Sequence, residues 1–78
     1  MLRDYCYSAN GIRILCDTRY VPFPIGRNNY ETAVFKSDKH GEIKKPGEPL
    51  EIITADDEAS AIKNHSKMIE KWANEAVL

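Results

Sequence analysis

The stretch DYCYSANGIRILCD (residues 4–17) decides the expected fold of the first part of the chain. Two runs with alternating side chains flank Asn10-Gly11. This dipeptide is preferred in two-residue β-hairpin turns, because both of its residues must adopt a positive φ. A turn of two residues fixes the register of the strands, so Tyr7 is expected to face Ile14 across the hairpin. The sequence therefore predicts a β-hairpin over residues 4–17.

The same register separates the two cysteines of the chain. Cys6 and Cys16 are expected on opposite faces of the hairpin, where they cannot form a disulfide. Two free thiols are typical of a protein from a reducing cytoplasm. Together with His40 and His65, the cysteines show none of the usual spacings of metal ligands. No metal ion and no other cofactor is therefore expected.

Length and composition limit the class of protein. The 78 residues fit a single domain with a small core, and 42% hydrophobic and 29% charged residues are typical of a folded chain. The net charge of −1 argues against general binding to duplex DNA. The sequence contains neither a run of about 18 apolar residues nor a recognisable secretory signal. No membrane association is expected, and a cytoplasmic location follows.

Residues 18–54 are predicted to form a loop followed by a second hairpin. Two prolines, a glycine and two asparagines make residues 18–29 a loop, because proline cannot sit in the middle of a sheet. Residues 30–37 and 50–54 are predicted strands joined by polar turns. The strand at 30–37 is apolar on both faces, so it is expected to be central. One face needs a cover from the 18–29 loop or from a second copy of the chain in a homodimer.

A helix is predicted from residue 55 to residue 75. Thr54 is the expected N-cap, with Asp57 completing a capping box. Small and apolar residues recur at helical spacing and predict the face that packs on the sheet. The expected fold is α+β, with a small antiparallel sheet of about four strands packed against one C-terminal helix. The predicted stripe consists of Ala59, Ile62, Ser66, Ile69, Ala73 and Ala76, flanked by His65, Met68 and Trp72.

Over residues 30–72 the chain resembles a group of very small proteins encoded by tailed phages and prophages. The shared pattern is E-T-x-V-F in a strand and T-acidic-acidic-E-A in a helix. It continues with a histidine, a methionine and a tryptophan at the spacing of His65, Met68 and Trp72. The hairpin at 4–17 has no counterpart in this group. The group has no established activity, so the resemblance implies a phage context in a host cytoplasm and carries over no catalytic residues.

The candidate contact surface is RYVPFPIGRNNYE (residues 19–31), which concentrates arginine, aromatic and amide side chains. Such side chains stack on bases and bind phosphate. Tyrosine and arginine also anchor protein interfaces. A third interpretation is a connector whose apolar residues pack on the sheet while its polar residues face water. The candidate contact residues are Arg19, Tyr20, Phe23, Arg27, Asn28, Asn29 and Tyr30.

Two functions are compatible with these residues. The first is a small non-enzymatic accessory protein that binds a host or viral protein through the 19–30 loop and the adjoining strands. The alternative is a nucleotide-binding protein that captures a host signalling nucleotide at a dimer interface, an anti-defence role. Catalysis is not expected, because no nucleophile, phosphate-loop or dinucleotide motif occurs. His65 is expected to pack between helix and sheet.

Overall fold

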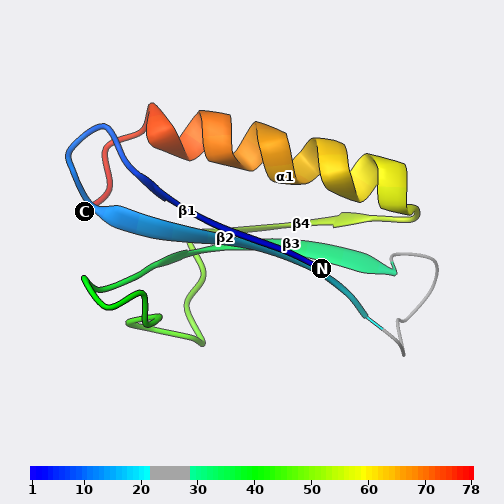
Figure 1. Ribbon diagram of the computed structural model, residues 1–78, viewed down its shortest axis with the longest axis horizontal. Coiled ribbons are helices and arrows are strands. Elements are labelled where there is room, and N and C mark those ends of the chain that lie inside the picture. The colour runs from blue at the N-terminus through cyan, green and yellow to red at the C-terminus, as the bar shows by residue number, and fades with distance from the viewer. Residues whose placement is uncertain (22–28) are drawn as a thin grey trace.

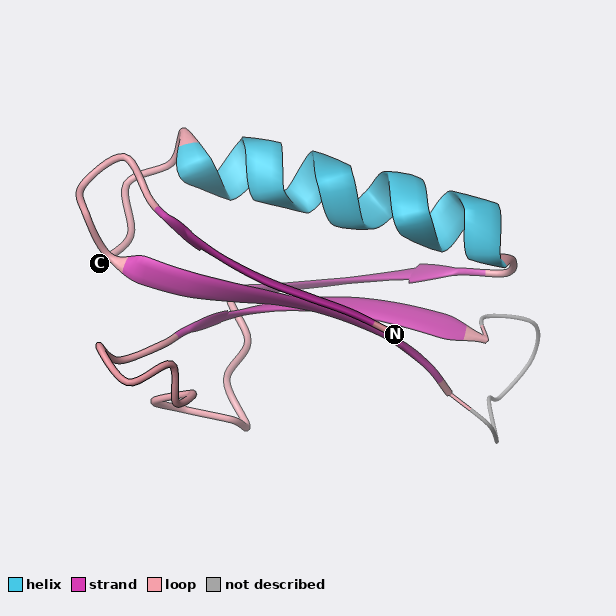
Figure 2. Ribbon diagram, in the orientation of Figure 1, coloured by secondary structure: helices cyan, strands magenta, loops and turns pink. Residues whose placement is uncertain are grey.

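The computed structural model describes residues 1–21 and 29–78. In this part of the chain four strands form one antiparallel sheet in the order β1-β2-β3-β4, and a single helix lies across one face (Figure 1; Figure 2). This arrangement confirms the predicted α+β fold with two hairpins and a C-terminal helix. The elements are β1 (Leu2–Tyr7), β2 (Arg13–Tyr20), β3 (Tyr30–Lys36), β4 (Glu51–Ala55) and α1 (Glu58–Ala73).

The turn between β1 and β2 contains three residues, and the prediction of a two-residue turn is wrong. The Ser8 N–H donates to the Ile12 carbonyl at 2.8 Å, and the Gly11 N–H donates to the Ser8 carbonyl at 3.0 Å. Gly11 adopts the left-handed conformation with a φ of 81°, whereas Asn10 does not. This is a type I turn followed by a left-handed glycine, in which a single residue needs a positive φ.

The extra turn residue displaces every predicted cross-strand pair by one position. Tyr7 pairs with Arg13 and Cys6 pairs with Ile14, so the predicted pairing of Tyr7 with Ile14 is wrong. A displacement of one residue moves side chains to the other face of a strand. Cys6 and Cys16 consequently lie on the same face of the sheet, toward α1, and the prediction of opposite faces is also wrong. Both thiols are free.

The side chain of Asn10 joins this turn to the C-terminal segment. Its amide nitrogen donates to the Val77 carbonyl at 2.6 Å, and its amide oxygen accepts from the Val77 N–H at 3.0 Å. The Ala9 N–H donates to the Glu75 carbonyl at 2.9 Å. These hydrogen bonds hold the turn against residues 75–77. The Val77 side chain is buried in the core.

The main core lies between α1 and the sheet. Hydrophobic side chains from β2, β3, α1 and the C-terminal segment form one buried cluster, and further apolar residues pack around it. Within the described residues there is no helix with the length and apolar character that crossing a bilayer requires. The buried members of the cluster are Ile14, Cys16, Val34, Met68 and Val77.

The opposite face of the sheet is also buried at its centre. Leu15 is fully buried, and Ala33 and Phe35 are nearly so. The connection between β3 and β4 lies beneath this face (Figure 1). The chain's own residues 37–50 therefore contribute a cover that was expected from the 18–29 loop or from a second copy.

Two side chains fasten this connection to the first hairpin. The Tyr5 hydroxyl donates to the Gly41 carbonyl at 2.9 Å, and Arg13 donates to the Lys39 carbonyl at 3.0 Å. The Arg13 guanidinium also lies 4.5 Å from the centre of the Tyr5 ring. Gly41 has a φ of 83°, and a Cβ there would lie 3.1 Å from the Tyr5 hydroxyl oxygen, so the close approach requires glycine.

The helix is shorter than the predicted 55–75 segment. Its N-cap is Asp57, whose carboxylate accepts from the Ser60 N–H at 2.7 Å. Thr54 cannot cap the helix as predicted, because it still belongs to β4 and pairs with β3. The strand extends one residue beyond its predicted end, and the capping motif is displaced by three residues toward the C-terminus.

The face of α1 that packs on the sheet also differs from the predicted stripe. Ala61, His65 and Met68 are the buried residues of the helix. Residues expected in the stripe, such as Ile62 and Ser66, are exposed. The residues predicted to flank the stripe therefore lie at its centre, which places an imidazole inside the core.

Candidate functional site

The predicted contact residues that the structure describes lie at one end of the sheet. Arg19 and Tyr20 belong to β2, so this strand continues into the segment that was predicted to be loop. Asn29 precedes β3, and its carbonyl accepts from the Val21 N–H at 2.7 Å. Tyr30 is the first residue of β3. Three of the predicted residues lie outside the described part of the chain: Phe23, Arg27 and Asn28.

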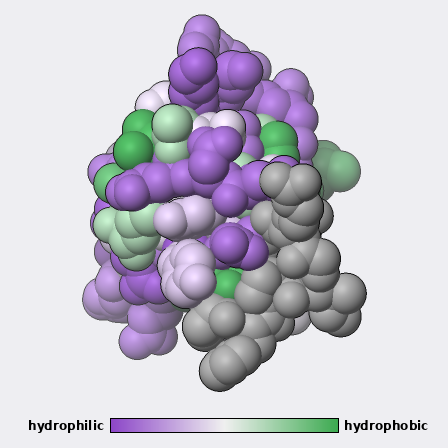
Figure 3. Space-filling model, turned by 90° about the vertical axis from the view of Figure 1, so that its right-hand side faces the viewer, coloured by the Kyte–Doolittle hydropathy of each residue, from purple (hydrophilic) through white to green (hydrophobic). Residues whose placement is uncertain are grey.

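Strand pairing brings the two tyrosines together. Tyr20 faces Tyr30 in the ladder, and their ring centres are 5.4 Å apart in an edge-to-face arrangement. Such aromatic pairs stabilise each other beyond the effect of burial. Tyr20 nevertheless remains 53% exposed, so an aromatic surface faces solvent here. Figure 3 views this end of the molecule, where hydrophilic atoms prevail and hydrophobic atoms form separate groups.

The neighbouring cation is not isolated. Arg19 pairs with Glu31 across the same strands, with 3.3 Å between guanidinium nitrogen and carboxylate oxygen. Its side chain is largely exposed, so this ion pair contributes little to stability. The carboxylate does, however, repel an approaching phosphate. The end of the sheet therefore presents an aromatic pair beside an Arg–Glu pair and carries no concentrated positive charge on these residues.

A buried polar network lies between α1 and the sheet. His65 is only 4% exposed, and its Nε2 lies 2.7 Å from the Asp4 carboxylate. Its Nδ1 lies 2.7 Å from the Thr18 hydroxyl oxygen, which lies 2.7 Å from the hydroxyl oxygen of Thr32. Each of these four side chains has a hydrogen-bond partner if the His65 Nε2–H donates to Asp4. The Thr18 hydroxyl then donates to Nδ1 and the Thr32 hydroxyl donates to Thr18. The network joins β1, β2, β3 and α1.

Cys16 also touches this histidine. Its sulfur is 3.6 Å from the His65 Nδ1, and the thiol donates to the His65 carbonyl at 3.8 Å. A carboxylate, an imidazole and a thiol are the groups that nucleophilic enzymes combine. Here burial, followed by nearby negative charges from Cys6, Asp4 and Asp17, raises the pKa of the Cys16 thiol to about 12. Burial and protonation both disfavour nucleophilic attack by this thiol.

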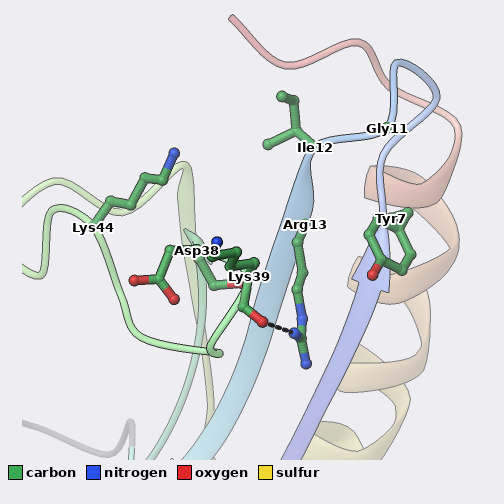
Figure 4. A pocket seen from close by; sticks show the side chains of 8 residues that line it. Tyr7, Gly11, Ile12, Arg13, Asp38, Lys39 and Lys44 are labelled. Atoms are coloured by element: carbon green, nitrogen blue, oxygen red, sulfur yellow. Dashed lines mark hydrogen bonds between the residues drawn. The ribbon is translucent and has the colours of Figure 1, made fainter.

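An open pocket lies at the other end of the sheet, between the first hairpin turn and the connection that follows β3. Its volume is about 470 Å³. Figure 4 shows side chains from the hairpin on one side and side chains from the connection on the other. This pocket could not be predicted from the sequence. Its walls meet only because of the observed β1–β2 register and because the β3–β4 connection folds beneath the sheet. The lining residues are Tyr7, Gly11, Ile12, Arg13, Ser37, Asp38, Lys39 and Lys44.

Cationic side chains outnumber anionic ones around this pocket. Arg13, Lys39 and Lys44 line it, against a single lining carboxylate, Asp38. Hydrogen bonds from the backbone N–H groups of Glu42, and then of His40, lower the pKa of the Asp38 carboxyl. These N–H groups lie 3.0 and 2.8 Å from the carboxylate oxygen, so Asp38 is bound within its own turn.

Within residues 1–21 and 29–78, the His, Cys, Asp and Glu side chains form no group of three that could hold a metal ion. Comparison with protein-family models, curated proteins and solved structures finds no match to the chain. Function must therefore be inferred from the chemistry of the described surfaces. Among the described residues, the Tyr20–Tyr30 pair and the cation-lined pocket are surfaces that offer binding groups.

Proposed function

We propose that the chain is a small, non-enzymatic, phage-type accessory protein that binds a host or viral protein through the 19–30 segment and the adjoining strands. The observation that carries this proposal is the exposed Tyr20 ring, which packs edge-to-face on the partly buried Tyr30 beside Arg19. Tyrosine and arginine are the residue types that most often anchor protein interfaces. A tyrosine held by its strand and by a neighbouring ring loses little entropy when a partner binds.

A protein partner suits this end of the sheet better than a nucleotide does. Glu31 lies against the Arg19 guanidinium and repels phosphate. A protein interface can use both members of the pair, because polar and charged groups of both signs occur at interface rims. In the nucleotide alternative, a phosphate at this position would compete with the Glu31 carboxylate for the Arg19 guanidinium.

The non-enzymatic part of the proposal is supported by the environment of His65. Both ring nitrogens are engaged within the core, by Asp4 and by Thr18. The neighbouring thiol and hydroxyls are buried, so neither is presented to a substrate. The network instead connects the helix to three strands, which is a structural role.

The test is affinity capture from bacterial host lysate with tagged wild-type protein and with the double variant Arg19→Ala/Tyr20→Ala. We expect a protein that is enriched on the wild type and lost on the double variant, because the variant removes both anchors. The matched control is Lys45→Ala, which removes an exposed cation from an ion pair with Glu48 in the β3–β4 connection.

The captured protein must then form a complex with purified wild type in light scattering. The control variant should retain this complex, and all variants should melt within a few degrees of the wild type, because the substituted side chains are exposed. A partner that binds the double variant as well as the wild type would contradict the proposed surface. Equal loss in Lys45→Ala would show that general charge controls capture.

A further inference from the structure

We propose that the pocket of Figure 4 binds a small anionic ligand with a planar aromatic body, of the nucleoside monophosphate class. This pocket lies at the opposite end of β2 from Tyr20, because its lining residue Arg13 is the first residue of that strand. The binding activity is therefore separate from the proposed protein contact. The shape of the pocket, its charge and one buried hydroxyl support it.

The dimensions of the pocket suit a ligand of this class. Its volume of about 470 Å³ falls within the range of about 300–1,000 Å³ that small-molecule sites occupy. Tyr7 is 64% exposed, and Ile12 lines the pocket from the same hairpin. An exposed phenol ring is a stacking surface for a nucleobase, and such stacking is a common way to hold a single base.

The charge of the pocket suits a phosphate. Arg13, Lys39 and Lys44 form no ion pair with any Asp or Glu among the described residues. The Arg13 guanidinium is held in place by the Lys39 carbonyl and the Tyr5 ring. Since a guanidinium has five N–H donors, this leaves donors for a ligand.

A buried hydroxyl on the pocket wall is an independent observation that points to a ligand. Ser37 is 4% exposed, and its Oγ has no hydrogen-bond partner among the described residues. Buried polar atoms without a partner are rare, because desolvation of the group is then uncompensated. Rotation of the Ser37 side chain toward the pocket would let a phosphate oxygen accept this hydroxyl proton. The same anion would lie near the two lysines, which line the pocket from the same connection as Ser37.

The test is calorimetric titration of the full chain with AMP, GMP, CMP and UMP at low ionic strength. Adenosine and inorganic phosphate serve as probes that each contain one half of the ligand. We expect at least one monophosphate to bind at least about tenfold more tightly than either half, because base and phosphate contact different walls. Phosphate that binds as tightly as every nucleotide would overturn the assignment of an aromatic ligand.

Two double variants separate the pocket from general electrostatics. Lys39→Ala/Lys44→Ala removes two cations from the pocket, and Lys63→Ala/Lys67→Ala removes two exposed cations from α1. We expect the first to raise the Kd at least about tenfold and the second to leave it within about twofold. Equal effects of the two variants would overturn the proposal.

Ser37→Ala distinguishes a role of the hydroxyl in ligand binding from a role in stability, because melting temperature and ligand affinity should respond differently. The substitution removes an unpartnered hydroxyl, so the melting temperature of the ligand-free protein should stay the same or rise while ligand affinity falls. Unchanged affinity would contradict the role of Ser37 in the site. The absence of binding by all four nucleotides at about 1 mM would overturn the proposal. So would loss of binding in Arg19→Ala/Tyr20→Ala, which would place the nucleotide at the other end.

Discussion

At the scale of single residues, His65 shows how a polar side chain can serve a hydrophobic core. Its ring fills space between α1 and the sheet, and Asp4 and Thr18 satisfy its nitrogens. Buried polar groups are costly unless they are hydrogen-bonded, so each member of the network depends on the others. Met68 and Trp72 contribute to the same layer between helix and sheet.

We expect the two cysteines to react at different rates in the folded protein. Burial raises the pKa of the Cys16 thiol to about 12, so this thiol is almost entirely protonated at about pH 8, and its sulfur is buried. Cys6 is only partly buried, although burial followed by the charge of Asp4 raises its pKa as well. Alkylation with iodoacetamide and peptide mass spectrometry should therefore modify Cys6 first.

The control for this prediction is alkylation in denaturant, where both thiols should react at similar rates. Native Cys16 that is alkylated as fast as Cys6 would contradict the proposed burial. It would also reopen the catalytic interpretation of the Cys16–His65 contact, because a nucleophilic thiol must be both ionised and accessible.

At the scale of elements, one carboxylate fastens the helix to the edge strand. Glu51 of β4 accepts from the Lys71 ammonium at 2.8 Å and from the Trp72 indole N–H at 2.9 Å. The hydrogen bond from Lys71, and then that from Trp72, lower the pKa of the Glu51 carboxyl. Both donors lie in the last turns of α1, so this contact fixes the helix end opposite its N-cap.

We expect Glu51→Gln to lower the free energy of unfolding by about 1 kcal/mol at about pH 7, because the charge-assisted hydrogen bonds are lost from a partly exposed site. A lowered folded-state pKa stabilises the fold above the ordinary carboxyl pKa, and this contribution is lost as pH falls through the lowered value. Urea unfolding from about pH 7 to about pH 2 should show the difference from wild type shrinking toward zero.

Glu48→Gln is the matched control, because Glu48 forms an exposed ion pair with Lys45 in the β3–β4 connection. Its effect should stay within about 0.5 kcal/mol across the same range. If Glu51→Gln lowered the free energy of unfolding by the same amount at every pH, the charge of Glu51 would not contribute to the contact between helix and strand.

The types of the elements could be predicted from the sequence, but the strand register and the start of the helix could not. Alternating residues predict the first hairpin, and helical spacing with acidic caps predicts α1. The register depends on whether Asn10 adopts a positive φ, and its side chain instead bonds Val77, which is 67 residues away in the sequence. Likewise Asp57 replaces Thr54 as the N-cap, because β3 holds Thr54 in the sheet. Long-range contacts decide both outcomes.

The same limit applies to the candidate sites. The tyrosine pair could be anticipated, because Tyr20 and Tyr30 bracket a predicted loop between strands that then pair. The pocket could not, because Arg13 and Lys39 are 26 residues apart and no motif connects them. Its position follows from the corrected register and from the connection that lies beneath the sheet.

At the scale of the whole molecule, the described part of the chain buries the centre of both faces of the sheet. Leu15 on the face opposite α1 is fully buried without a second copy. The centre of this face therefore needs no second copy as its cover, and we predict a monomer. Light scattering of the isolated chain should give a mass near 8.9 kDa. A concentration-independent mass of about twice that value would contradict this expectation and point to a self-association surface elsewhere.

The bonds that Asn10 forms with Val77 have a consequence for the kinetics of folding. They close a loop of 67 residues in a chain of 78, so they are among the contacts whose formation is entropically most costly. Local hairpins and the helix can form before this closure, which therefore belongs to the late side of the folding barrier. Weakening the closure would accelerate unfolding and leave the folding rate nearly unchanged. We therefore expect loss of the Asn10 side chain to shorten the lifetime of the native state more than it slows folding.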